Sequence, residues 1–419
     1  MSKPTANGRV AYVLQNPLNS RDYERFGIPD LLAEGIGVAV IDVSAVVHPH
    51  IEFPASAPEA FPEVETIRAP SAGEIGNIVP RLAAANVIFN LAESGFVTRG
   101  NLPVFRVLAR AGKPYLATAS NSFPAWNRKV EDRPSLRARG GDMFIRRRQI
   151  NPLRSLLARI PPAWLGATAP AFIVRGGRRS MDNRLVGPGT VAIDAHAMDY
   201  DIYLREAARR PVASDTAVFI DENRPFHRDL KEMGYDSIVE PDDYFAKLRH
   251  LFGRIEKELG LAVVIAASPR TDYASRPHLF GGRRVIQGGT ARAIAECRLV
   301  LAHRSTAIGF AVMFEKPVLQ IATRDNYEHP TQRPYFDGFA RALNKPITFY
   351  DDPAAADLGR AMVIDRRASA EYMADYVKRP ETPNKSYWRI VLDELRRHGV
   401  LPSGAVSSVT ADDRKRLAL

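Results

Sequence analysis

The 419-residue sequence predicts an α/β protein with two Rossmann-like domains and an active site in the cleft between them. The chain is too long for one ordinary hydrophobic core, so two domains are expected. Short apolar runs alternate with helix-length segments, which is typical of parallel sheets covered by helices. Polar residues follow several of these runs, and parallel sheets bind their ligands beyond the carboxyl ends of the strands.

The composition indicates an anionic partner. The formal net charge is +11, from 58 basic and 47 acidic residues, which suits nucleotide sugars, lipid phosphates, an acidic membrane face or nucleic acid. Nucleic acid is disfavoured, because there is no zinc-finger spacing, RNP-like motif or basic helix with interleaved aromatics. Cys297 is the only cysteine, which excludes an intramolecular disulfide and a cysteine-based zinc cluster. No signal-like segment or apolar run of ~20 residues is found, so a cytoplasmic protein is expected.

The first domain is expected over residues 1–210. Its predicted strands cover residues 9–15, 38–43, 87–91, 115–118 and 171–174. Gly35 and Gly37 precede a strand, and the third glycine of a dinucleotide fingerprint is missing, so no dinucleotide site is predicted. Glu93 follows the third strand, where it should face the cleft, and it is one candidate for a general base.

A basic segment interrupts the first domain between residues 120 and 166. Its arginines alternate with apolar side chains, and these residues are Arg137, Arg139, Phe144, Ile145, Arg146, Arg147, Arg148, Ile150, Leu153, Arg154, Leu156, Leu157, Arg159, Ile160 and Trp164. A cationic segment with an apolar face can lie on an anionic membrane, which would make the protein peripheral at the inner face of the membrane. The alternative is a solvated insertion whose leucines pack on the first domain.

His196 lies where the first domain should pass into the second. Because that position should face the cleft, His196 is the first choice for a general base, and a hydrogen-bonded structural histidine is the alternative. Asp199-Tyr200-Asp201 matches a DxD metal-binding pattern. An aspartate directly before a helix also caps it and suits its dipole, so no metal site is predicted.

The second domain is expected over residues 211–367. Its predicted strands cover residues 216–220, 261–267, 285–287, 299–302 and 318–321. The loop residues that follow the first three of these strands include Glu222, Arg270, Gly288, Gly289 and Thr290. Because the carboxyl ends of parallel strands share one edge, these residues should converge on a nucleotide phosphate. Residues 368–400 should be mostly helical, and residues 401–419 are expected to be disordered.

A polar elbow follows the strand predicted at residues 299–302. The elbow consists of His303, Arg304, Ser305 and Thr306. Ser and Thr are good N-cap residues, so a helix is expected to begin at Ser305 and Thr306 and to end before Pro317. Two hydroxyls, an imidazole and a guanidinium at a helix N-terminus suit a phosphate, although an ordinary N-cap beside a surface arginine is the alternative.

Three stretches resemble GT-B-type glycosyltransferases of bacterial capsule and O-antigen clusters. They are NPLNSRDYERFGI at residues 16–28, FIDENRPFH at residues 219–227, and the C-terminal domain from Val218 to Thr323. The resemblance implies transfer of a sugar from a nucleotide-sugar donor to a hydroxyl of a surface-glycan or lipid-linked acceptor. It also implies that the terminal helices return to the first domain. No metal or other cofactor is expected, because arginines and helix N-termini would take the place of a metal.

The implied reaction is direct displacement, in which a general base assists the acceptor hydroxyl and cationic and N–H groups stabilise the departing phosphate. Many of these enzymes carry a ribose-binding Glu where this chain has Phe310. CMP is therefore ranked nearly level with UDP as the nucleotide. Two alternatives stay open: a sugar-nucleotide epimerase or other group transferase on the same fold, and a non-catalytic nucleotide- or glycan-binding protein.

Overall fold

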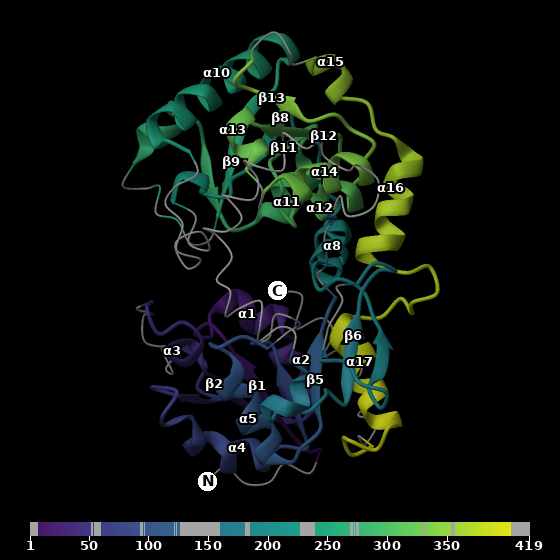
Figure 1. Ribbon diagram of the computed structural model, residues 1–419. Helices are drawn as coiled ribbons and strands as arrows, with labels where there is room; N and C mark the ends of the chain where they lie inside the picture. Colours follow the sequence, from purple (N-terminus) through teal and green to yellow (C-terminus); the bar gives the residue numbers. More distant parts are fainter. Residues whose placement is uncertain are drawn as a thin grey trace, which may run out of the picture.

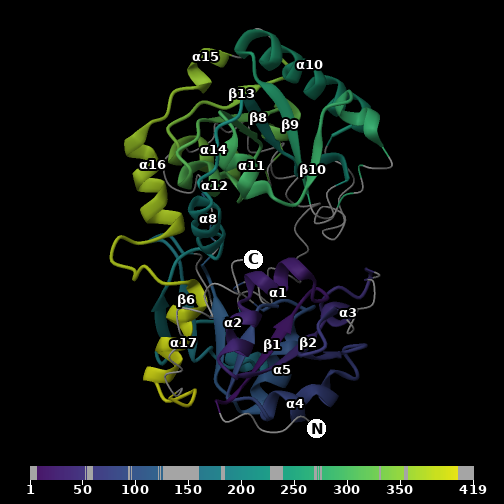
Figure 2. The same ribbon diagram turned by 180° about the vertical axis from the view of Figure 1, so that it is seen from behind.

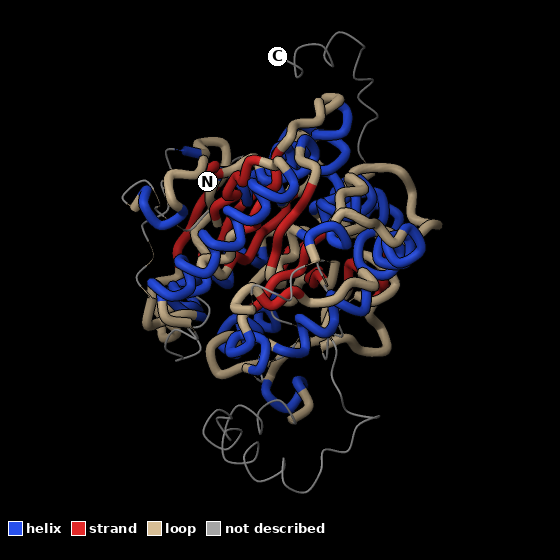
Figure 3. Tube along the Cα trace, turned by 90° about the horizontal axis from the view of Figure 1, so that it is seen from above, coloured by secondary structure: helices blue, strands red, loops and turns tan. Residues whose placement is uncertain are grey.

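The computed structural model describes residues 7–51, 53, 60–92, 95, 97–120, 122, 124–125, 160–180, 185–226, 239–268, 271, 273, 276–329, 332–352 and 357–403. Two parallel sheets, each covered by helices, follow one another along the chain (Figure 1). The view from above shows helices flanking the strands (Figure 3). The predicted fold class of two Rossmann-like α/β domains is confirmed.

The first sheet has the strand order β3-β2-β1-β4-β5-β6-β7, and all its pairs are parallel. Its elements are β1 (Arg9–Leu14), α1 (Ser20–Arg25), α2 (Ile28–Ala33), β2 (Gly37–Asp42), α3 (Ser44–Val47), β3 (Glu65–Arg68), α4 (Val79–Ala83), β4 (Val87–Asn90), α5 (Leu102–Ala111), β5 (Tyr115–Thr118), β6 (Phe172–Arg175) and β7 (Val191–Asp194). A short 3-10 turn, Pro162–Leu165, precedes β6.

The second sheet has the order β10-β9-β8-β11-β12-β13 and is also parallel throughout. Its elements are α8 (Asp199–Ala208), β8 (Thr216–Ile220), α10 (Pro241–Leu259), β9 (Ala262–Ala267), β10 (Val285–Gln287), α11 (Thr290–Glu296), β11 (Leu299–Ala302), α12 (Ile308–Met313), β12 (Val318–Ala322), α13 (Arg324–Glu328), α14 (Arg333–Ala342), β13 (Thr348–Phe349) and α15 (Leu358–Ala361).

Each sheet has a separate hydrophobic core on each of its two faces. Alternate residues of β1 divide between them: Tyr12 packs in one cluster and Val13 in the other. In the second sheet, Phe219 and Val218 of β8 divide in the same way. This alternation follows from the two-residue period of a strand, and it explains why the central strands appear as continuous apolar runs.

The C-terminal segment packs against both domains. Helix α16 (Arg366–Tyr372) continues into a π-helical turn (Met373–Val377) and contacts α14 of the second domain. Helix α17 (Tyr387–Arg397) then contributes Trp388, Val391 and other residues to a core cluster of the first sheet. The two opposite views show α16 beside the upper domain and α17 beside the lower one (Figures 1 and 2).

The strands that the sequence did not reveal are β3, β7 and β13, and each lies at the edge of its sheet. An edge strand is buried less completely, so it does not need the continuous apolar run that marks a central strand. Most of the basic segment (residues 126–159) and most of the tail (residues 404–419) lie outside the described residues. In the part of the chain that the structure describes, no helix has the length and apolarity to cross a bilayer.

Candidate functional site

The candidate site lies at the carboxyl edge of the second sheet, where the loops after β8 and β11 meet. These strands are neighbours, so the residues that follow them are brought side by side. The backbone N–H of Arg304 donates a hydrogen bond of 2.7 Å to the Glu222 carboxylate. The same carboxylate forms an ion pair of 3.1 Å with Arg224. Two of the predicted site residues, Glu222 and Arg304, are therefore in direct contact.

Gln332 links both guanidinium groups of this site. Its Oε1 accepts hydrogen bonds from Arg224 Nη1 at 2.7 Å and from Arg304 Nε at 2.6 Å. Arg224 is only 2% exposed and also donates to Asn326 at 3.3 Å. Three separate loops are thus held together by one amide oxygen and one carboxylate. Gln332 and Asn326 were not predicted as site residues, because neither directly follows a strand predicted from the sequence.

Arg304 is held in place on several sides. Its guanidinium lies over the Tyr335 ring, 5.1 Å from the ring centroid, while Gln332 fixes Nε and Glu222 fixes the backbone N–H. A cation held in one geometry needs little reordering when it binds an anion. The chain then continues through half-buried Ser305 to exposed Thr306, so the elbow reaches the surface there.

The helix after the elbow begins later than predicted. Helix α12 starts at Ile308, and Ser305 Oγ accepts the N–H of Ala307 at 3.2 Å instead of capping a helix that begins at Ser305. The N–H groups of Ile308 and Gly309 donate to the carbonyls of Ser305 and Thr306. These i→i−3 bonds occupy donors that a helix N-terminus would otherwise present. The hydroxyls and the Arg304 guanidinium therefore remain the better candidates for phosphate binding.

His303, the first residue of the elbow, is fully buried. Its ring stacks on Tyr244, with centroids 5.9 Å apart, and Nε2 lies 3.5 Å from the Tyr350 hydroxyl. Burial, together with the nearby Arg224 charge, lowers the pKa of His303 to about 3. The imidazole is therefore neutral at physiological pH, and its contacts with Tyr244 and Tyr350 anchor the start of the elbow in the domain core.

The acidic residues of the β8 loop differ in their proton affinity. Burial raises the pKa of Asp221 to about 6, although hydrogen bonds from the Tyr273 hydroxyl (2.7 Å) and the Asn223 N–H oppose that rise. Burial also acts to raise the pKa of Glu222, but the positive charges of Arg224 and Arg304 outweigh it and lower that pKa. Glu222 therefore stays ionised as the partner of the two arginines.

The other predicted residues are farther from the elbow or lie outside the described residues. Gly288 and Gly289 follow β10 with positive φ of 82° and 66°, and Thr290 begins α11. Strand β10 is three strands from β11, which is about 14 Å at the usual strand spacing. Arg270 and Glu93 lie outside the described residues.

His196 is fully buried at the junction of the two domains. Its Nδ1 lies 3.0 Å from the Ala197 carbonyl oxygen, and its Nε2 lies 3.0 Å from that of Lys385. Residue 196 also forms an isolated antiparallel bridge with Lys378 of the C-terminal segment. These contacts favour the structural alternative for this histidine over a role as general base.

The DxD pattern forms structural contacts. Asp199 is the first residue of α8, after the N-cap Met198, and forms an ion pair of 3.2 Å with Arg25. Asp201 accepts the N–H of Tyr387 at 2.9 Å, which ties α8 to the start of α17. The predicted capping role is therefore wrong, because both aspartates lie within the first turn of α8 and neither precedes the helix. Among the described residues, no group of three or more His, Cys, Asp or Glu side chains is arranged to hold a metal ion.

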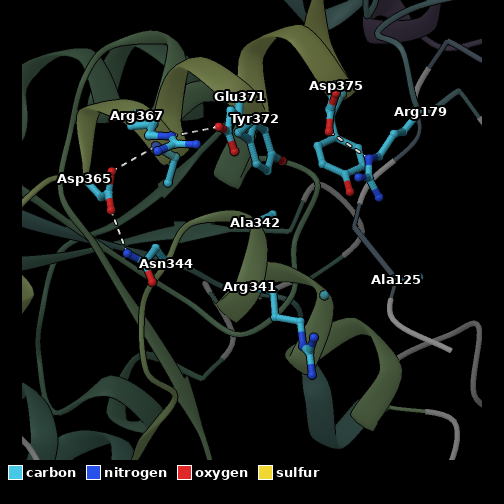
Figure 4. Close-up of a pocket in the computed structure, with 13 residues that line it drawn as sticks. Ala125, Arg179, Arg341, Ala342, Asn344, Asp365, Arg367, Glu371, Tyr372 and Asp375 are labelled. Carbon is cyan, nitrogen blue, oxygen red and sulfur yellow. Dashed lines mark hydrogen bonds and ion pairs between the residues drawn. The ribbon is translucent and has the colours of Figure 1, made fainter. Parts of the chain in front are cut away.

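A separate pocket of about 600 Å³ lies where both domains meet the C-terminal segment (Figure 4). None of the predicted site residues lines it. Its charged groups pair with one another: Arg179 with Asp375 at 2.8 Å, and Arg367 with Glu371 at 3.1 Å. Its lining residues are Ala125, Arg179, Gly338, Arg341, Ala342, Asn344, Asp365, Arg367, Ala368, Glu371, Tyr372, Asp375 and Tyr376. We therefore place the candidate site at the elbow and not in this pocket.

No protein-family model matches the chain, and a search of curated proteins finds no match. Among solved structures, the chain is similar to the spinosyn forosaminyltransferase SpnP, with 14% identity and a TM-score of 0.47 over 93% of this chain and 99% of that one. The chain is also similar to a variant of the wall teichoic acid polymerase TagF, with 10% identity and a TM-score of 0.47 over 99% of this chain and 91% of that one. Similarity to the UDP-GlcNAc 2-epimerase from Methanocaldococcus jannaschii has 12% identity and a TM-score of 0.44 over 93% of this chain and 99% of that one. The function proposed below rests on the residues of this chain.

Proposed function

We propose that the protein is a glycosyltransferase that moves a sugar from a nucleotide-sugar donor to a hydroxyl of a surface-glycan or lipid-linked acceptor. The observation that carries this proposal is the guanidinium of Arg304, which Gln332 and Glu222, themselves held by buried Arg224, fix at the carboxyl edge of a parallel sheet. Ligands of such sheets bind at this edge, and an arginine held in a fixed geometry suits a phosphate group.

In this proposal, Arg304 and the hydroxyls of Ser305 and Thr306 bind the donor phosphates. Arg224 is too deeply buried to reach a ligand, so it positions Glu222 and Gln332, which in turn fix Arg304. The bond between the sugar and the phosphate breaks as the acceptor hydroxyl attacks, and the negative charge that develops on the leaving phosphate is stabilised by these donors.

The acceptor hydroxyl loses its proton to a general base in the same step. Glu93 follows β4 of the first domain in the sequence and is our candidate for that base. His196 is the weaker candidate, because its two ring nitrogens lie beside backbone carbonyls in a fully buried site.

Thermal unfolding with a panel of nucleotides tests the proposal without a known acceptor. A nucleotide that binds only the folded protein raises the free energy of unfolding by ~2.7 kcal/mol when its concentration is ~100 times its dissociation constant. Each kcal/mol raises the melting temperature of a domain of this size by ~2–4 °C. One of CMP, UDP, GDP and dTDP should raise the melting temperature more than the others do, because a base pocket distinguishes between nucleotide bases while a phosphate site does not.

ATP and NAD serve as controls from other classes of α/β protein. A response to these controls alone would contradict sugar transfer and the epimerase together. Conversion of the responsive nucleotide sugar to an epimer, without any acceptor, would favour the epimerase. Binding without turnover of the donor in the presence of glycan acceptors would favour the non-catalytic alternative.

A further inference from the structure

Trp164 is the most exposed large hydrophobic side chain among the described residues, with 82% of its surface accessible. It lies on the 3-10 turn Pro162–Leu165, on the outside of the first domain. By contrast, Trp388 is 2% exposed and packs in the core. An indole so open to water would gain hydrophobic stabilisation if a partner covered it.

Arg106 of α5 borders this turn, and two further basic residues follow it along the chain. Arg106 donates from Nε to the Leu165 carbonyl at 3.2 Å, which joins the helix to the turn. Arg110 lies one helical turn further along, on the same face of α5, and Lys113 follows the end of the helix. All three side chains belong to exposed residues.

No carboxylate accompanies these charges along the chain. The sequence contains no Asp or Glu from residue 94 to residue 130, or from residue 160 to residue 181. Other surface helices of this protein differ: on α10, for example, Arg254 pairs with Glu258 at 2.7 Å. The face that combines Trp164, Arg106, Arg110 and Lys113 is therefore both basic and topped by an indole. We call it the α5 face.

We propose that the α5 face docks on an anionic phospholipid bilayer, with the Trp164 ring in the headgroup region and the three basic side chains against lipid phosphates. Tryptophan is the side chain most typical of the membrane–water interface, and each nearby Lys or Arg adds affinity for an anionic leaflet. An acidic protein would also suit the charges. An acidic protein would be expected to receive Trp164 within a larger apolar patch, whereas no other large hydrophobic side chain of this turn is exposed among the described residues.

Sedimentation with vesicles tests this proposal, and it needs no nucleotide. The full-length protein should bind vesicles of phosphatidylglycerol and phosphatidylcholine more tightly than vesicles of phosphatidylcholine alone, and salt should weaken that binding. Trp164→Ala should weaken it ~10-fold, because the apolar contact is lost. The double variant Arg110→Ser, Lys113→Ser should weaken it ~25-fold, from ~5-fold for each charge near the surface.

Matched controls separate this face from general attraction by a basic protein. Val212→Ala removes an apolar side chain that is 81% exposed elsewhere, and Arg366→Ser, Arg367→Ser removes two charges from α16. Both controls should bind as the wild type does. Equal losses in the control and α5-face variants would overturn the proposal, and so would equal binding to neutral and anionic vesicles.

Fluorescence gives a second readout. In a Trp126→Phe background only Trp164 and Trp388 emit, and Trp388 is buried, so anionic vesicles should shift the emission of Trp164 to shorter wavelength. If the emission wavelength of Trp164 does not change when the protein is bound to vesicles, the indole stays in water and its assigned role is overturned. The Ser305→Ala, Thr306→Ala variant should bind vesicles normally, so failure of the donor site and failure of the docking face can be told apart.

Discussion

Gly27 lies directly against the indole of Trp388, and a Cβ at this glycine would overlap the ring. The residue has a positive φ of 63°, and the indole N–H of Trp388 donates to the Arg25 carbonyl at 2.8 Å. The same ring stacks on Phe89 of β4, with centroids 5.3 Å apart. The C-terminal helix is therefore fixed to the first domain by a contact that only glycine permits.

Gly27→Ala should destabilise the protein by ~2–4 kcal/mol. Overpacking against the indole contributes ~1–3 kcal/mol, and the left-handed backbone adds ~1 kcal/mol. Gly112→Ala is the matched control, because Gly112 has the same φ of 63° and nothing within 4 Å of a Cβ there. Gly112→Ala should lower the free energy of unfolding, measured in urea, by only ~1 kcal/mol. Equal effects of the two substitutions would mean that α17 does not pack as described.

Gln332 should be needed for anion binding, because its amide oxygen holds both arginines. Gln332→Leu removes that acceptor and should lower both the stability and the affinity for the responsive nucleotide, by ~1.5–3 kcal/mol for a hydrogen bond to a charged group. Gln332→Glu keeps an acceptor but adds a negative charge, so it should retain the fold and still weaken nucleotide binding. Calorimetric titration beside thermal unfolding checks both. Unchanged affinity in both folded variants would remove this network from the donor site.

The elbow hydroxyls should contribute directly to donor affinity. Ser305→Ala, Thr306→Ala should weaken nucleotide binding by ~150-fold or more, since each of the two hydrogen bonds to a phosphate is worth ~1.5–3 kcal/mol. The fold should remain nearly intact, because Thr306 is exposed and Ser305 is half-buried. If the thermal shift with nucleotide survives undiminished in the double variant, the nucleotide binds elsewhere.

His303 should make the fold sensitive to acid. Its pKa is about 3 in the folded protein and ~6.5 in an unfolded chain, so below pH ~6.5 only the unfolded state takes up the proton. Stability is thereby lost as the pH falls, at up to ~1.4 kcal/mol per unit. Between pH 7 and pH 5, wild type should lose ~2 kcal/mol relative to His303→Gln in urea unfolding.

Asp221 provides a control of opposite sign for that experiment. Its pKa of about 6 lies above the ~3.9 of an unfolded chain, so its contribution to stability is present at low pH and is lost as the pH rises from 4 to 6. Asp221→Asn should therefore remove a gain in stability on acidification, whereas His303→Gln removes a loss. Parallel pH profiles for wild type and both variants would contradict both assignments.

Substitution of Glu93 should lower turnover, whereas substitution of His196 should lower stability. Glu93→Gln should lower donor turnover by ~100-fold or more while nucleotide binding is kept, as expected for a general base. His196→Gln should instead lower the melting temperature, because the ring is buried between two backbone carbonyls. If His196→Gln abolishes turnover in a protein of normal stability, and Glu93→Gln does not, the two roles are reversed.

Much of the site could be anticipated from residues that directly follow central strands. Glu222 and Arg304 were expected at one edge because β8 and β11 are short runs that are apolar apart from Thr216, and the pairing of these two strands brings the residues into contact. Gln332 and Asn326 gave no such signal, since they lie around a short helix whose position depends on packing. The late start of α12 was also hidden, because Ser305 can either cap a helix or close a turn.

The sequence by itself determined the α/β class, the central strands and the polar character of their carboxyl ends. These depend on local patterns, namely the run of apolar residues that a doubly buried strand requires and the polar residues that end it. Only the tertiary structure decided that His303 and His196 are buried, that Gln332 joins two arginines, and that Trp164 stands in water while Trp388 is enclosed. Burial and pairing depend on which distant segments meet, and no local pattern encodes that for a single polar or aromatic side chain.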